Sequence, residues 1–241
     1  MVRYQSTQSC NLSKRASMDP RSFWEDKIVD WEDGRYGSAE ASSTALERIA
    51  DKSSASLRFR LKFARELLLP KVKDKRVIEI GCGSGFLTAD IICSGAESYI
   101  GFDIAESAIA RAKKISIEAG IADKAEYIRS DLESLDILQA DIVFSLGLLD
   151  WLRDDELDRL FRISGDALWL HAIAERRASP SQWLHRIYVH LAYGHRTKGY
   201  VPRYYAPSEI EAIAQRYNSR QVRILRDPRL SFGAMLSTLD D

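Results

Sequence analysis

A glycine-rich stretch, VIEIGCGSGFL at residues 77–87, is the part of the sequence best suited to ligand chemistry. Gly81, Gly83 and Gly85 stand at alternate positions directly after a short apolar run. Glycines there let the backbone come close to a ligand, because no Cβ atom stands in the way. The stretch can therefore hold a phosphate, a dinucleotide, or a nucleoside that carries no phosphate.

The spacing of the glycines decides among these ligands. A phosphate-binding loop has the pattern G-x-x-x-x-G-K-[ST], but the first lysine after the glycines is Lys113. The dinucleotide fingerprint is G-x-G-x-x-G, whereas this stretch, with Glu79, gives E-x-G-x-G-x-G. Asp103 follows about twenty residues later, where a carboxylate can accept hydrogen bonds from ribose hydroxyls. A nicotinamide dinucleotide site places an acid similarly, so Asp103 alone does not discriminate.

Four stretches in order resemble the motifs of class I S-adenosylmethionine-dependent methyltransferases. VIEIGCGSG at 77–85 is similar to the first motif, SYIGFD at 98–103 ends at the ribose acid, YIRSDL at 127–132 resembles the third motif, and ADIVFSLGLLDWL at 140–152 resembles the fourth. The resemblance spans about 76–172 and implies S-adenosyl-L-methionine as cofactor. It also implies that Asp131 faces the adenine amino group and that Ile104 and Leu132 contact the adenine ring.

The cofactor-binding residues implied by this resemblance come from the ends of successive strands. They are Glu79, Gly81, Cys82, Gly83, Gly85, Asp103, Ile104, Asp131, Leu132 and Leu146.

The fourth motif also narrows the methyl acceptor. Enzymes that methylate amino groups in nucleic acids often carry [ND]-P-P-[YF] there, whereas this chain reads SLGLLD. Neither Cys82 nor Cys93 is placed to attack a pyrimidine carbon. Both of these reactions are therefore disfavoured. The LGLLDWL element at 146–152 and the N-terminal segment SFWEDKIVDWEDGRYG at 22–37 resemble methyltransferases that act on sugars, glycans or secondary metabolites. This resemblance implies transfer to an oxygen, or in second place a nitrogen, of such a small molecule. Candidate catalytic residues are Asp150, His171 and His195.

A basic, aromatic segment at 193–207 is the candidate acceptor-binding region. Its sequence after Tyr193 is GHRTKGYVPRYYAP, and it can meet a phosphate or carboxylate on the acceptor. The residues predicted to bind the acceptor are Arg196, Lys198, Arg203 and Tyr205.

Apolar runs at 76–80, 98–102, 125–129, 140–146 and 167–172 alternate with amphipathic stretches at 85–93, 106–119 and 154–164. This alternation predicts an α/β fold with a doubly wound, mostly parallel sheet. Two last strands, about 220–226 and 230–238, predict an antiparallel hairpin at its C-terminal edge. The expected fold is a seven-stranded Rossmann-like sheet with N-terminal cap helices, the second at about 41–51 and a third around 57–68.

The predicted organisation has three parts. Residues 1–18 form a polar leader, 19–70 a helical cap, and 71–241 the cofactor-binding core, with a helix and loop inserted at about 178–207. The insertion includes a helix at 182–193. A capping box formed by Ser208 and Glu211 is expected to open a further helix that ends near 217.

Composition limits the setting and the partners. Three cysteines and the lack of an apolar run of about 20 residues predict a cytoplasmic protein without a membrane span. The formal net charge is zero, which disfavours a nucleic-acid partner, and no residues have the spacing of metal ligands. From residue 171 onward, however, the chain carries eleven basic residues and six acidic ones. An RNA or protein methyltransferase, or a silent cofactor-binding subunit, therefore remains an alternative.

Overall fold

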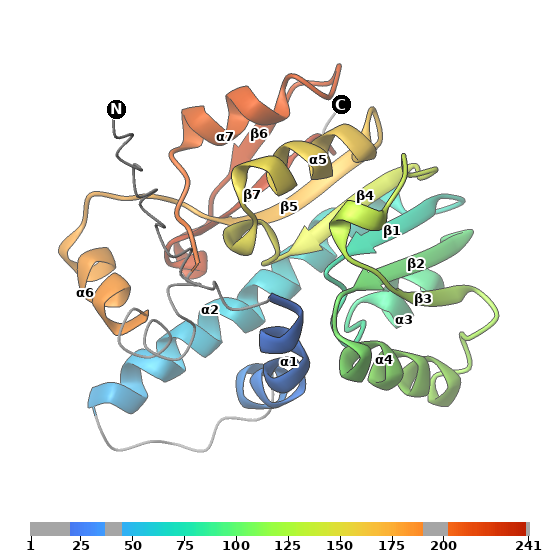
Figure 1. Cartoon of the computed structure of the whole chain (residues 1–241), viewed down its shortest axis with the longest axis horizontal. Coiled ribbons are helices and arrows are strands. Elements are labelled where there is room, and N and C mark those ends of the chain that lie inside the picture. Colours follow the sequence, from blue (N-terminus) through green and yellow to red (C-terminus); the bar gives the residue numbers. More distant parts are fainter. Residues whose placement is uncertain (1–19, 37–44, 190–201, 240–241) are drawn as a thin grey trace, which may run out of the picture.

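The computed structural model describes residues 20–36, 45–189 and 202–239. Its centre is a seven-stranded sheet with the order β3-β2-β1-β4-β5-β7-β6 (Figure 1). Only β7 runs antiparallel to its neighbours. The strands are β1 (Arg76–Ile80), β2 (Ser98–Asp103), β3 (Ala125–Arg129), β4 (Ile142–Leu146), β5 (Leu168–Ala174), β6 (Arg223–Leu225) and β7 (Gly233–Ser237). The predicted doubly wound sheet and its antiparallel edge hairpin are confirmed.

Helices cover both faces of the sheet (Figure 1). They are α1 (Pro20–Tyr36), α2 (Ala45–Leu68), α3 (Thr88–Cys93), α4 (Glu106–Glu118), α5 (Asp154–Ser164), α6 (Pro180–Val189) and α7 (Pro207–Ala214). Short 3-10 helices are η1 (Leu69–Lys71), η2 (Leu132–Ser134), η3 (Leu149–Trp151) and η5 (Pro228–Leu230). One buried cluster joins α2, α3 and α4 to the sheet, and the other joins α5 and α7 to the opposite face.

The side chains of successive residues in the central strands belong to the two buried clusters on opposite faces of the sheet. In β4, Ile142 and Phe144 belong to the α2, α3 and α4 side, whereas Val143 belongs to the α5 side. Because side chains alternate along a strand, a sheet buried on both faces needs the near-continuous apolar runs that the sequence contains. The order of the strands reverses between β1 and β4, which is the place where such sheets bind ligands.

The N-terminal part differs in detail from its prediction. The helices expected at 41–51 and around 57–68 are one continuous helix, α2, from residue 45. The predicted break between them is wrong, because the polar stretch DKSSAS carries no glycine or proline to end a helix. Helix α1 lies beside α2 and α4 (Figure 1).

The C-terminal part brings a second correction. Helix α7 begins at Pro207, with Ala206 as its N-cap and no capping by a side chain. The predicted Ser208–Glu211 capping box is therefore wrong, and a proline at the first helical position sets the start. The insertion holds α6, which ends at Val189 within the described residues, and the residues of the expected helix beyond 189 lie outside them.

The expected polar leader at 1–18 also lies outside the described residues. Within the described ranges, no helix has both the length and the apolar character required to cross a bilayer.

The packing of α5 generates a stability prediction. Leu160 is fully buried between α5 and the sheet, whereas Ile137 is 70% exposed in the loop before β4. Leu160→Ala removes buried methyl groups and leaves a cavity, so we expect it to lower the free energy of unfolding by about 2–5 kcal/mol. Ile137→Ala is the control, with an expected change within about 0.5 kcal/mol. Urea denaturation followed by circular dichroism measures both, and equal losses would contradict the assigned packing.

Candidate functional site

The glycine stretch forms the loop that follows β1. Gly81, Gly83 and Gly85 have φ angles of 72°, 51° and 71°, in the left-handed region that side chains other than glycine rarely adopt. The backbone N–H groups of Gly81 and Cys82 both donate to the carbonyl of Phe102, at 2.7 and 3.0 Å. The loop is thus fastened to the end of β2, at the point where the strand order reverses.

Asp103 is the last residue of β2, and its carboxylate joins this loop to the start of α4. One oxygen accepts a hydrogen bond from the Gly83 N–H at 2.8 Å, and the other accepts from the Ala105 N–H at 2.9 Å. Burial raises the pKa of this carboxyl, while the backbone donors oppose the shift. Asp103 is therefore a buried acid that shapes the loop and still has lone pairs for a ligand.

The side chains of Glu79 and Cys82 are buried in the protein interior next to the loop. Tyr99 donates its hydroxyl to the Glu79 carboxylate at 2.5 Å, and burial raises the pKa of Glu79 to about 8. The Cys82 sulfur packs against Gly101 of β2, where a Cβ atom would lie 2.8 Å from it. Both side chains support the loop from below.

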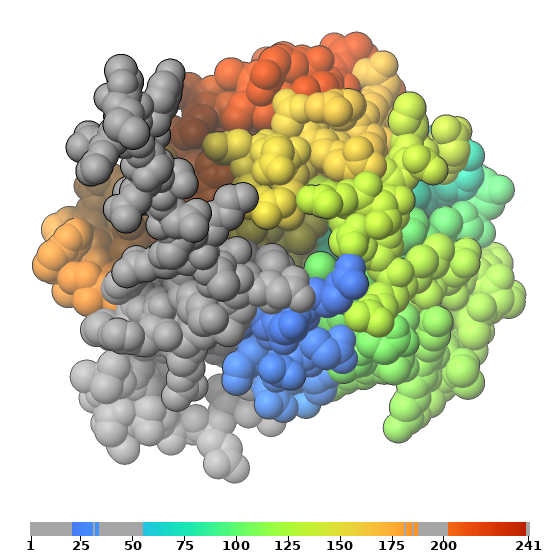
Figure 2. Space-filling model, in the orientation of Figure 1, coloured from blue at the N-terminus to red at the C-terminus, as the bar shows by residue number. Residues whose placement is uncertain are grey.

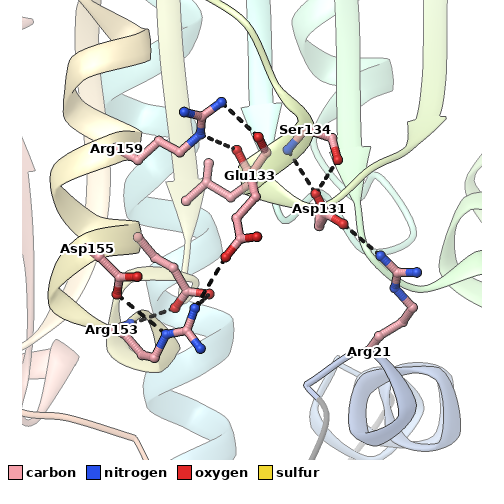
Figure 3. Close-up of polar contacts among 9 residues, drawn as sticks. Arg21, Asp131, Glu133, Ser134, Arg153, Asp155 and Arg159 are labelled. Carbon is pink, nitrogen blue, oxygen red and sulfur yellow. Dashed lines mark hydrogen bonds and ion pairs between the residues drawn. The ribbon is translucent and has the colours of Figure 1, made fainter.

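Asp131 lies after β3 and caps the short helix η2. It accepts hydrogen bonds from the N–H and hydroxyl of Ser134, at 2.9 and 2.5 Å, and pairs with Arg21 of α1 at 2.7 Å (Figure 3). These contacts, with the Ser134 hydroxyl first, lower the pKa of Asp131. Leu132 is partly buried, and its carbonyl accepts a hydrogen bond from Arg159 (Figure 3). The third motif thus contacts α1 through the Asp131–Arg21 ion pair.

Helix α1 makes further polar contacts with this region. Glu25 accepts hydrogen bonds from the N–H groups of Glu106 and Ser107, at 2.6 and 3.0 Å, and so caps α4. Glu32 is 3% exposed and accepts from both the N–H and the hydroxyl of Ser84 in the glycine loop. Figure 2 shows the atoms of α1, in blue, beside the green atoms of the core. Helix α1 therefore covers the loop.

Glu32 is a site residue that the sequence analysis missed. It lies beside Gly83, and burial raises the pKa of its carboxyl. A helical signal was available, since Arg21, Glu25 and Glu32 recur at spacings of four and seven along one face of α1.

The second half of the site lies at the end of β4. Leu146, the last residue of β4, is partly buried, and Gly147 follows it with a φ of 99°. The next residue, Leu148, lies against Gly81, where a Cβ atom would be 3.3 Å from it. The glycine loop and the end of β4 therefore border one another, as a cofactor site at the switch in strand order requires.

Asp150, in η3, is a buried carboxyl at this same end. It is 9% exposed, and one of its oxygens accepts a hydrogen bond from the Ala174 N–H at 2.7 Å. Burial raises its pKa to about 6, against the effects of the Ala174 N–H and of Arg60. Trp151 beside it packs edge-on against Trp24 of α1, with ring centroids 5.0 Å apart. The structure thus places the Asp150 carboxyl between the segment after β4 and the end of β5.

His171 lies elsewhere than predicted. It was expected to end the fifth strand near the crevice, but it is the fourth of seven residues of β5 and is fully buried. Its Nδ1 is 2.9 Å from the Ser145 hydroxyl, and burial lowers its pKa to about 3. The expected position is wrong because β5 continues past His171 to Ala174. A neutral imidazole enclosed in the core has no route to an acceptor.

The candidate acceptor segment is described only from residue 202 onward. His195, Arg196 and Lys198 lie outside the described residues. The Arg203 guanidinium pairs with Asp154 at 2.7 Å, and the buried Tyr205 donates its hydroxyl to the carbonyl of Leu149 at 2.7 Å. The backbone N–H of Arg203 also donates to the carbonyl of Asp150 at 2.7 Å. The segment borders the end of β4, but both of these side chains contact the protein.

Metal binding finds no support in the described ranges, where no three His, Cys, Asp or Glu side chains gather in a way that could hold an ion.

Residues 77–168 match a protein family described as a methyltransferase domain. The chain is 36% identical over 109 residues to the ribosomal protein L11 methyltransferase of Haemophilus influenzae strain PittEE, across 44% of this chain and 36% of that protein. It is 30% identical over 96 residues to the tRNA U34 carboxymethyltransferase of Actinobacillus pleuropneumoniae serotype 7, across 39% of this chain and 30% of that protein. The matches thus span about a third of the length of these curated relatives.

Solved structures agree on the fold. The magnesium protoporphyrin IX methyltransferase of Synechocystis PCC 6803, with bound S-adenosylhomocysteine, superposes with a TM-score of 0.67 at 16% identity, covering 90% of this chain and 96% of that one. A Mesorhizobium loti S-adenosylmethionine-dependent methyltransferase gives 0.53 at 21% identity, covering 74% and 96%. The predicted methyltransferase fold is confirmed, and the family match supports S-adenosyl-L-methionine as the cofactor.

The raised pKa of Asp150 generates a prediction of pH dependence. Its pKa is higher in the folded chain than the usual 3.8, so folding favours the protonated form. The resulting stabilisation is complete below pH 4 and is lost as the pH rises through about 6. Asp150→Asn keeps the acceptor for the Ala174 N–H but cannot ionise. We expect wild type to lose about 2 kcal/mol relative to this variant between pH 4 and 7.

Urea unfolding at steps of half a pH unit measures this difference. Glu79 and the other acids are present in both proteins, so their titration cancels. Parallel stability curves for wild type and Asp150→Asn across this range would contradict the burial of an ionisable Asp150.

Proposed function

We propose that the chain, through the methyltransferase domain matched at residues 77–168, is a class I S-adenosylmethionine-dependent methyltransferase. It moves a methyl group from S-adenosyl-L-methionine to an oxygen, or in second place a nitrogen, of a small molecule, a sugar or glycan, or a secondary metabolite. The observation that carries this proposal is the left-handed glycine loop tied to Asp103 at the switch point of the sheet.

In the proposed complex the cofactor spans the ends of β1, β2 and β3. The glycine loop gives its backbone close approach, because each left-handed glycine lacks a Cβ atom. The remaining lone pairs of Asp103 accept the ribose hydroxyls, and Asp131, Leu132 and Ile104 border the adenine. The fit of the residues to the nucleoside supports this placement.

The cofactor, when bound, supplies an activated methyl group on a positively charged sulfur. The chain's own task is to hold the acceptor in line, to exclude water, and to accept a proton where the acceptor carries one. Helix α1, fastened over the glycine loop by Glu32 and over α4 by Glu25, is the element that would exclude water.

Among the three catalytic candidates, Asp150 has the placement that suits a proton acceptor. It lies at the end of β4, in a buried position that raises its pKa to about 6, close to a neutral working pH. We propose it in that role in preference to His171, which lies inside the core. The proposed roles of His195, Arg196 and Lys198 rest on the sequence alone.

A macromolecular acceptor is the second candidate. The similarity to the ribosomal protein L11 methyltransferase favours it, as does the basic C-terminal third. Several of these basic side chains are engaged within the protein, however. Arg177 and Arg226 pair with Glu175, and Arg203 pairs with Asp154. Pairing of this kind reduces the charge available to a nucleic acid, so we keep the small molecule as the first proposal.

Calorimetric titration with S-adenosylhomocysteine tests the proposed cofactor. We expect micromolar binding to wild type and a loss of about 2–4 kcal/mol in Asp103→Ala, because each charge-assisted hydrogen bond contributes about 1.5–3 kcal/mol. Asp136→Ala, an exposed acid after η2, is the matched control and keeps wild-type affinity. A folded wild-type protein that does not bind would overturn the proposal.

Salt-dependent RNA retention separates the two acceptor classes. For a small-molecule enzyme we expect no binding of a mixed RNA pool at 50 mM salt in a filter assay. Retention that falls steeply between 50 and 200 mM salt would favour the macromolecular acceptor, because basic side chains then release counterions from phosphates. Formation of S-adenosylhomocysteine with any acceptor in a screen excludes a silent cofactor-binding subunit.

A further inference from the structure

Arg60 brings a guanidinium group to the end of β4 from the distant helix α2. Its two terminal nitrogens each lie 2.9 Å from the position that a Cβ atom on Gly147 would occupy. Gly147 has a φ of 99°, so both backbone strain and the nearby guanidinium favour a glycine there. The side chain therefore reaches the border of the crevice where the glycine loop meets the end of β4.

The guanidinium of Arg60 is incompletely paired. Its Nε is buried and has no hydrogen-bond partner, and no ion pair joins it to an acid among the described residues. Arg65 and Arg76, by contrast, pair with Asp90 and Asp141. A buried donor without a partner is costly, so its presence at a binding site points to a ligand atom that completes it.

Asp150 is an acid close enough for the charge of Arg60 to lower its pKa, but its carboxylate accepts its hydrogen bond from the Ala174 N–H. The two groups thus share the end of β4 without a direct ion pair between described atoms. We call the region around Gly147 and Asp150, after the end of β4, the methyl-transfer mouth. Because Arg60 makes no ion pair with Asp150 there, its guanidinium is available to bind an anionic ligand. The fork of five donors matches a carboxylate, which it can bind through two parallel hydrogen bonds.

We propose that Arg60 binds a carboxylate at the methyl-transfer mouth. The proposal rests on the proposed function and adds a specificity-determining residue to it. Two sources carry that chemistry in the proposed reaction: the amino-acid end of the cofactor and an acidic group on the acceptor. Leu148, the residue after Gly147, lies against Gly81 of the glycine loop, so either group would reach Arg60 at this border in the proposed complex.

The first experiment removes the carboxylate from the ligand and the guanidinium from the protein in one cycle. S-adenosylhomocysteine and its decarboxylated analogue are titrated into wild type, Arg60→Met and Arg60→Lys. If the cofactor supplies the carboxylate, Arg60→Met weakens S-adenosylhomocysteine about 10- to 100-fold and leaves the analogue unchanged. Arg60→Lys, which keeps the charge but not the fork, gives a smaller loss. Lys62→Met, an exposed cation on the same helix, is the control.

The second experiment uses protein saturated with S-adenosylhomocysteine and measures its thermal stabilisation by matched acids and amides. Benzoate with benzamide and glucuronate with glucuronamide are the probes. If the acceptor supplies the carboxylate, wild type and Lys62→Met prefer at least one acid over its amide, and Arg60→Met loses that preference.

The outcomes distinguish a failure of the role proposed for Arg60 from a failure of the proposed function on which it rests. Wild type that binds both cofactor analogues, with no acid preference that depends on Arg60 in either experiment, overturns the role of Arg60 and leaves the cofactor site standing. If Arg60→Met and Arg60→Lys both weaken the binding of the two cofactor analogues equally, the side chain has a structural role, and the proposal for Arg60 is also overturned. Wild type that binds neither analogue contradicts the proposed function, and the role of Arg60 falls with it.

Discussion

The pair of hydrogen bonds accepted by the Asp103 carboxylate is the interaction on which the site depends. It ties the Gly83 N–H of the β1 loop to the Ala105 N–H before α4, and so joins the ends of two strands and the start of a helix. Without that acceptor, the two N–H groups would be buried and unpaired. The left-handed conformation of the glycines turns the loop so that the Gly83 N–H points at the Asp103 carboxylate. The conformation of the loop and the position of the acid therefore depend on each other.

The same arrangement gathers three buried acidic groups around the loop. Burial raises the pKa values of Glu32, Glu79 and Asp103, and repulsion from Asp103 adds to the shifts of the other two. Glu32 comes from α1, outside the core, so covering the loop adds an acid to it. A positively charged ligand lowers this repulsion, because the burial cost of each carboxylate falls when an opposite charge is near. The electrostatics of the loop therefore suit a cation.

The sequence predicted the core better than the parts that complete it. The strands from β1 to β5 were readable because each apolar run is short and bounded, and the positions of Asp103 and Asp131 followed from the order of the motifs. His171 was misplaced because the run LWLHAIA gives no sign of where the strand ends. Glu32 and Arg60 were missed because their partners lie more than fifty residues away, and local periodicity carries no information about such contacts.

The difference between the core and the elements around it limits what can be inferred about the acceptor from related proteins. The family match covers residues 77–168, and the match to the ribosomal protein L11 methyltransferase is similarly short. Three contacts come from outside this range: Glu32 of α1 accepts from Ser84 in the glycine loop, Arg60 of α2 reaches Gly147, and the backbone N–H of Arg203, before α7, donates to Asp150. Relatives that share only the core share the means of holding a cofactor. In the proposed reaction, the elements outside this core would select the acceptor, so its identity has to be determined from this chain's own residues.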